Sequence, residues 1–119
     1  MLQQRAFSSK RLNLRVKTRE GVWVYWRCHG RDDTSRVRDL SLGGLFVETA
    51  TPREVNSTAE VDFLVQEGQI RVAAVVRHRE TGRGLGLKFT AINDGGRPRL
   101  TELMNRLRSW PSGKTQNST

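Results

Sequence analysis

The sequence predicts a small all-β protein, an antiparallel barrel or sandwich, followed by one C-terminal helix. Three observations lead to this prediction. Apolar and polar residues alternate in short runs, and turn residues separate these runs roughly every ten positions. Near the end of the chain the apolar period changes to that of a helix. A chain of 119 residues is long enough for one domain with its own core.

The expected strands are rich in β-branched and aromatic residues, and the expected turns contain glycine, proline or aspartate. In chain order we expect strands over residues 12–16, 22–28, 34–40, 45–48, 59–66, 70–77 and 85–89. The expected turns are residues 19–21, 30–33, 43–44, 51–54, 67–68 and 81–84. Alternation in the second strand puts Cys28 on the same face as Val22, Val24 and Trp26, so we interpret it as a small core residue.

The helical period is carried by five residues spaced as one face of a helix, namely Leu100, Leu103, Met104, Leu107 and Trp110. We expect this stripe to cover one open end or face of the β-structure. Pro98 is compatible with a first helical turn, and we expect Pro111 to end the helix. Residues 1–10 are expected to form a flexible basic arm, and residues 111–119 a disordered polar tail.

The net charge of +9 indicates an anionic partner, which could be nucleic acid, a nucleotide, an anionic lipid or an acidic protein surface. No apolar run approaches the roughly 20 residues of a membrane-spanning helix, and the first residues contain no stretch of signal-peptide length. A single cysteine fits a reducing compartment. We therefore expect a cytoplasmic protein without membrane insertion.

Two short motifs carry the candidate chemistry. Arg11 and Arg15 form an RxxxR pair, and Asp39, Ser41 and Gly44 form a DxSxxG segment about two dozen residues later. The planar fork of arginine binds phosphate or the guanine edge with two hydrogen bonds, and a carboxylate accepts from the N1–H and amino groups of guanine. Taken separately, the arginines could be a solvated edge, and the second motif could be an ordinary turn. Both motifs in this order, flanking a β-hairpin, favour nucleotide binding.

These motifs resemble the signature of the PilZ domain family. The resemblance continues through the segments 44–48 (GLFVE), 75–77 (VVR) and 84–89 (GLGLKF), and the terminal amphipathic helix also matches. It implies a six-stranded antiparallel β-barrel with a C-terminal helix, here over residues 11–110. It also implies a receptor for the bacterial second messenger cyclic di-GMP, bound as a ligand and not as a cofactor.

The resemblance further implies roles for individual residues. Arg11 and Arg15 would hold the phosphates and the guanine edge or face, and Asp39 would accept from guanine. Ser41 would bond phosphate or base, and Gly44 would allow the ligand to approach the backbone closely.

Four further residues are possible additional contacts, namely Lys10, Arg38, Gly43 and Arg77. Lysine at position 10 stands where the family often has arginine and lacks its fork. We interpret the segment 77–79, with His78 at its centre, as a solvated strand end.

The function implied is a non-catalytic module that orders its N-terminal arm on binding cyclic di-GMP and then signals to an effector protein in motility, adhesion or exopolysaccharide control. No nucleophile–base pair and no metal-ligand spacing is visible, so neither an enzyme nor a metal site is expected. Two alternatives stay open: a PilZ-like adaptor that works through protein contacts without ligand, and a basic small-barrel nucleic-acid binder. Of these partners, nucleic acid is the one we least expect.

Overall fold

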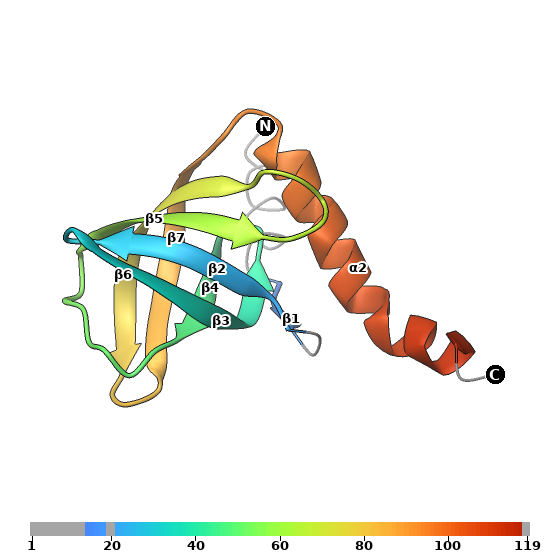
Figure 1. Cartoon of the computed structure of the whole chain (residues 1–119), viewed down its shortest axis with the longest axis horizontal. Coiled ribbons are helices and arrows are strands. Elements are labelled where there is room, and N and C mark those ends of the chain that lie inside the picture. Colours follow the sequence, from blue (N-terminus) through green and yellow to red (C-terminus); the bar gives the residue numbers. More distant parts are fainter. Residues whose placement is uncertain (1–13, 19–20, 118–119) are drawn as a thin grey trace, which may run out of the picture.

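The computed structural model describes residues 14–18 and 21–117 (Figure 1). This part of the chain forms seven strands followed by one long helix. The strands are β1 (Val16–Lys17), β2 (Trp23–Cys28), β3 (Arg31–Ser41), β4 (Gly44–Glu48), β5 (Thr58–Leu64), β6 (Arg71–Glu80) and β7 (Gly84–Ile92), and the helix is α2 (Gly96–Asn117).

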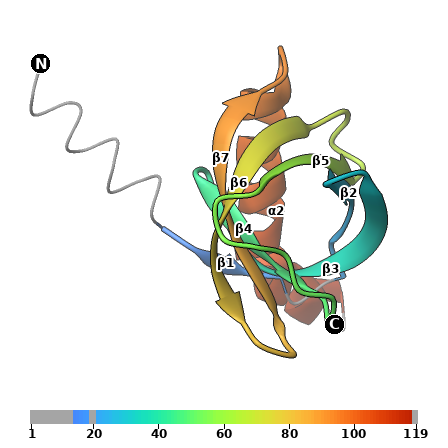
Figure 2. The same cartoon turned by 90° about the vertical axis from the view of Figure 1, so that its left-hand side faces the viewer.

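Six of these strands close into an antiparallel barrel. They run in the order β3-β2-β5-β6-β7-β4, and β4 returns to pair with β3. Strand β1 lies outside this circle and adds to β3, with Val16 opposite Leu40. Figure 2 views the ring of strands from the end opposite α2. The predicted six-stranded antiparallel barrel with a C-terminal helix is therefore confirmed.

The barrel interior is filled by the apolar residues that alternate along each strand. Val22, Val24, Trp26 and Cys28 are at most 1% exposed and face the core, as their alternation predicts. The indole Nε1–H of Trp26 donates to the hydroxyl of Ser35 at 2.9 Å, so this large buried ring leaves no polar atom unpaired. The strands thus keep one face apolar and leave the other for polar side chains.

Helix α2 lies across one end of the barrel and completes the core (Figures 1 and 2). Leu100, Leu103, Met104 and Leu107 are all buried in the same cluster as the barrel residues, which confirms the predicted apolar stripe for these four. The side chain of Trp110, the fifth residue of the stripe, lies outside the part of the chain that the structure describes. In the described chain, no helix has both the length and the apolar character that crossing a membrane requires.

The C-terminal boundary of the helix differs from the expected one. α2 continues past Pro111 to Asn117, so the predicted end at Pro111 is wrong. Proline removes one backbone donor and disfavours the helical conformation of the residue before it, which bends a helix without always ending it. The last turns of α2 leave the axis of the earlier ones (Figure 1).

The hairpin between β2 and β3 is tighter than predicted. Residues His29 and Gly30 both have positive φ angles, 55° and 72°, as a two-residue hairpin turn requires. Asp32 and Asp33, expected in the turn, therefore lie in β3. There Asp32 accepts a hydrogen bond from Arg27 Nε at 2.8 Å, directly across the strand pair.

Other strand ends also differ from the prediction. The alternation from Leu12 to Val16 gives only a two-residue strand, β1, and Leu14 before it is 61% exposed. Strands β6 and β7 each run three residues further than expected.

An ion pair ties α2 to the turn between β5 and β6. Arg106 donates from Nε to Glu67 Oε2 at 2.6 Å and from Nη2 to Oε1 at 3.0 Å. The Glu67 side chain is only 8% exposed. These hydrogen bonds from Arg106 outweigh the partial burial of the carboxyl group and lower the pKa of Glu67.

We expect Glu67→Gln to lower the free energy of unfolding at pH 7 by roughly 1–3 kcal/mol, because it removes a charge-assisted bidentate contact. Since the folded-state pKa of Glu67 is lowered, the pair stabilises fully above the unfolded pKa of about 4.3 and this contribution is lost as pH falls through the folded pKa. Urea unfolding at pH 7 and at stepwise lower pH measures both effects. Glu102→Gln, on an exposed position of the same helix, is the control. Equal losses in the two variants would contradict this role of Glu67.

Candidate functional site

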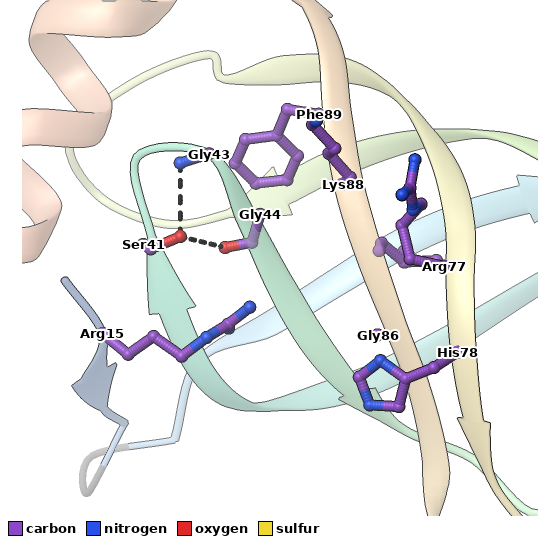
Figure 3. Close-up of a pocket in the computed structure, with 10 residues that line it drawn as sticks. Arg15, Ser41, Gly43, Gly44, Arg77, His78, Gly86, Lys88 and Phe89 are labelled. Atoms are coloured by element: carbon purple, nitrogen blue, oxygen red, sulfur yellow. Dashed lines mark hydrogen bonds between the residues drawn. The ribbon is translucent and has the colours of Figure 1, made fainter. Parts of the chain in front are cut away.

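A cavity of about 460 Å³ opens on the outer surface of the barrel, over β7 and the turn between β3 and β4 (Figure 3). Arg15 approaches it from one side, and Arg77 and His78 of β6 lie on the other. The full lining consists of Arg15, Ser41, Gly43, Gly44, Arg77, His78, Gly86, Leu87, Lys88 and Phe89. Three of these side chains are cationic at neutral pH and none is acidic, so the cavity suits an anion.

Arg15 is held at the cavity by Asp39. Its Nη1 lies 2.7 Å from Oδ1 of Asp39, and the two side chains are 49% and 7% exposed. Position 15 precedes β1, and β1 pairs with β3 so that Lys17 lies opposite Asp39. The added strand therefore brings the first motif to the second.

The other oxygen of Asp39 is bound by Arg38. Nε of Arg38 lies 3.0 Å from Oδ2, and its Nη1 lies 3.2 Å from Glu80 at the end of β6. Burial acts against the charge of Arg38, but the hydrogen bonds to these two carboxylates outweigh it and raise its pKa. Asp39 is thus buried between two guanidinium groups and does not itself line the cavity.

The register of β3 against β4 explains where Arg38 points. The pairing shifts between Val37 and Asp39, which is a β-bulge with Arg38 as the extra residue. Its guanidinium carbon lies 3.6 Å from the ring centroid of Phe46 on β4, a cation–π contact. The bulge therefore directs Arg38 over the outer face of the barrel.

Ser41 ends β3 and Gly44 begins β4, with Gly43 in the two-residue turn between them. The hydroxyl of Ser41 donates to the Gly44 carbonyl and accepts from the Gly43 N–H, both at 3.2 Å. A Cβ at position 44 would lie 2.3 Å from the carbonyl oxygen of Leu87. Close approach at Gly44 is therefore to the backbone of β7, and its predicted contact with ligand stays a prediction.

A second bulge places Arg77. The pairing of β6 with β7 shifts between Val76 and His78, which leaves Arg77 as the extra residue. Its exposed side chain lines the cavity opposite Arg15 (Figure 3).

His78 and Gly86 line the cavity on the β6 side, and Phe46 packs beneath the His78 ring. His78 lies opposite Gly86 in the strand pairing, and its ring occupies the space where a side chain at position 86 would stand. The same ring packs against Phe46, with centroids 6.0 Å apart and planes tilted by 40°.

The family model of the PilZ domain matches residues 3–106, which is most of the chain. The chain belongs to the PilZ domain family. No curated protein matched it.

Several solved structures are similar to this PilZ domain. The PilZ domain of YcgR from Escherichia coli, described with c-di-GMP, is 18% identical with a TM-score of 0.70, covering 87% of this chain and 95% of that one. The PilZ domain of CeSA from a cellulose-synthesizing bacterium is 18% identical with a TM-score of 0.63, covering 81% and 99%. The Bacillus subtilis inhibitor of motility MotI/DgrA is 21% identical with a TM-score of 0.64, covering 79% of this chain. The matched region is only 49% of that longer protein.

The structure brings together most of the PilZ motif residues predicted as the site. Arg15, Ser41, Gly43, Gly44 and Arg77 line one cavity. Asp39 and Arg38 lie beside it, joined to Arg15 through the shared carboxylate. Arg11 and Lys10 lie outside the described residues, as does the arm 1–10.

Sequence reasoning missed five residues of the lining, namely His78, Gly86, Leu87, Lys88 and Phe89. The sequence places His78 in a solvated strand end, whereas the structure packs its ring on Phe46 at the cavity. The alternation of residues 84–89 could have shown that Gly86 and Lys88 share a face. The residue opposite His78 in the strand pairing could not be predicted from the sequence, because the bulge at Arg77 shifts the register of β6 against β7. In the described part of the chain, no group of three or more His, Cys, Asp or Glu side chains is arranged to hold a metal ion.

We expect Gly44→Ala to destabilise this PilZ domain by about 1–3 kcal/mol, because the new methyl group would collide with the Leu87 carbonyl of a paired strand. Thermal unfolding measures the loss. Gly21→Ala is the matched control, since its methyl group would meet only the exposed Trp23 side chain, at 3.3 Å. An unchanged melting temperature for Gly44→Ala would show that β4 and β7 are not as close as described.

Proposed function

We propose that this PilZ domain is a non-catalytic receptor for cyclic di-GMP. The observation that carries the proposal is the cavity where the two motif segments meet, lined by Arg15, Arg77 and Lys88 without an acidic side chain. Cyclic di-GMP has two phosphates and two guanines, so it needs both cations and acceptors for guanine N–H groups. The YcgR PilZ domain, with the same fold, is described with this ligand.

The arginines would supply most of the binding free energy. Arg11 and Arg15 would bind phosphate or the guanine edge through their forks, and Arg77 would add charge from the opposite wall. The hydroxyl of Ser41 and the N–H of Gly43 are close enough to share a phosphate or base contact once their mutual hydrogen bond is exchanged.

Asp39 would have two roles. It holds Arg15 at the cavity, and it would accept from guanine N1–H and amino groups. An ionised carboxylate offers about four lone-pair positions, and the two arginines use one hydrogen bond on each oxygen. Because Asp39 is buried, guanine would reach it only after Arg15 turns from the carboxylate toward a phosphate.

The receptor would signal through its N-terminal arm. Residues 1–10 precede Arg11 and Arg15 directly, so binding of the arginines to phosphate would order the arm against the barrel. The ordered arm and ligand would form a surface for an effector protein. Motility or exopolysaccharide control is the proposed output, since relatives include an inhibitor of motility and a domain from a cellulose-synthesizing bacterium.

We expect Arg11→Ala and Arg15→Ala each to weaken cyclic di-GMP binding roughly ten- to a hundredfold, the loss of one bidentate contact. Isothermal titration calorimetry of the full chain measures the affinity. Arg31→Ala, an exposed arginine at the start of β3 outside the cavity lining, removes the same charge and should leave binding unchanged.

The same titration tests the alternatives. A parent chain that binds a short oligonucleotide with steep salt dependence, but not cyclic di-GMP, would be a nucleic-acid binder. A parent chain that binds neither would be a ligand-free adaptor. Either result would overturn the proposed function, and GMP serves as the control for a single nucleotide.

We expect Asp39→Ala to reduce guanine selectivity more than phosphate affinity. The measurement is the ratio of affinities for cyclic di-GMP and cyclic di-AMP, because adenine lacks the N1–H and 2-amino donors. In the parent this ratio should exceed about tenfold, and it should approach one in the variant. Asp33→Ala, in the same strand and outside the cavity lining, should keep the parent ratio. If Asp39→Ala also keeps it, Asp39 does not accept from guanine.

A further inference from the structure

The outer face of β7 lacks side chains at two positions, and two aromatic rings fill the space. A Cβ at Gly84 would lie 2.6 Å from the Phe46 ring, and a Cβ at Gly86 would lie 2.3 Å from Cε1 of His78. Phe46 and His78 therefore lie close to the β7 backbone. A residue with any side chain at position 86 would displace the imidazole.

The His78 ring is held on its protein side and open on the other. It contacts Phe46 at a centroid distance of 6.0 Å, and its Nε2 lies 3.9 Å from Oε2 of Glu80. Phe46 in turn is 2% exposed and is covered by Arg38. The His78 side chain is nevertheless 56% exposed and lines the cavity. It is thus a positioned, accessible aromatic surface.

The other aromatic ring of the described lining is less available. Phe89 is half-buried, packs against the core, and meets Phe63 edge-on at a centroid distance of 6.3 Å. His78 is therefore better placed to offer an aromatic surface to a ligand. The cations around it, Arg15, Arg77 and Lys88, suit the phosphates attached to such a ligand.

We propose that His78 is a base-stacking residue of this site and that Gly86 positions it. The proposal rests on the proposed function and adds to it the surface on which one purine of the cyclic dinucleotide lies. Histidine and other aromatic rings stack nucleobases, and each such contact contributes substantially to affinity. A purine stacked on His78 keeps its phosphates between the cationic walls of the cavity.

The test compares four single variants and one double variant of the full chain by calorimetric titration with cyclic di-GMP. His78→Ala should weaken binding about ten- to a hundredfold, which is the range for loss of one stacking contact. His78→Phe should keep affinity within about threefold, because stacking needs a flat ring and not the imidazole nitrogens. Arg79→Ala, one residue further along β6 and outside this cavity, should bind like the parent.

Gly86→Ala tests the positioning directly. It should weaken binding by displacing the ring of His78, and it should have little further effect when His78 is already alanine, because its action passes through that ring. Circular dichroism and thermal unfolding confirm that each variant is folded before titration.

The outcomes separate this inference from the proposed function. If the parent binds cyclic di-GMP and His78→Ala binds equally well, the stacking role is overturned while the receptor function stands. If His78→Phe loses as much affinity as His78→Ala, the imidazole acts through hydrogen bonds or charge, and stacking is overturned. If the parent does not bind, both the receptor function and the stacking role are overturned.

Discussion

The fold and the site both depend on one narrow seam, where β4 pairs with β3 on one edge and with β7 on the other. Without β4 the sheet would stay open between β3 and β7, with two unpaired edges. Gly44 and Gly84 make this closure possible, because a Cβ at either would collide with a backbone carbonyl across the seam. The candidate cavity lies over the same seam, so barrel closure and site assembly share one geometric requirement.

Charge at the seam is organised around the buried carboxylate of Asp39. A buried carboxylate is tolerated when it is paired and hydrogen-bonded, and Arg15 and Arg38 each supply one such contact. The pairing fixes Arg15, which comes from before the barrel, and Arg38, which also reaches Glu80 at the far end of β6. Through these two arginines, Asp39 links the segment before β1, the bulge of β3 and the end of β6.

Much of the fold could be predicted from the sequence, whereas the arrangement of the cavity depends on the register of the paired strands. Alternation identified the core face of β2, and helical spacing identified the buried face of α2, because both patterns are local. The cavity could not be predicted from such local patterns alone. Arg38 and Arg77 occupy bulges, whose positions depend on how neighbouring strands are paired, and His78 reaches the cavity only because Gly86 lies opposite it.

The turn between β2 and β3 was also misplaced by composition. Asp32 and Asp33 suited a turn, but His29 and Gly30 already supplied the required positive φ angles.

The position of Cys28 has a practical consequence for experiments on this protein. It is the one cysteine in the sequence, and its thiol lies inside the barrel with 1% of the residue exposed. An alkylating reagent can reach it only when the strands separate, so the labelling rate measures how often the barrel opens. The chain therefore carries a built-in probe of global opening, and an engineered surface cysteine can be labelled selectively in the native protein without replacing Cys28.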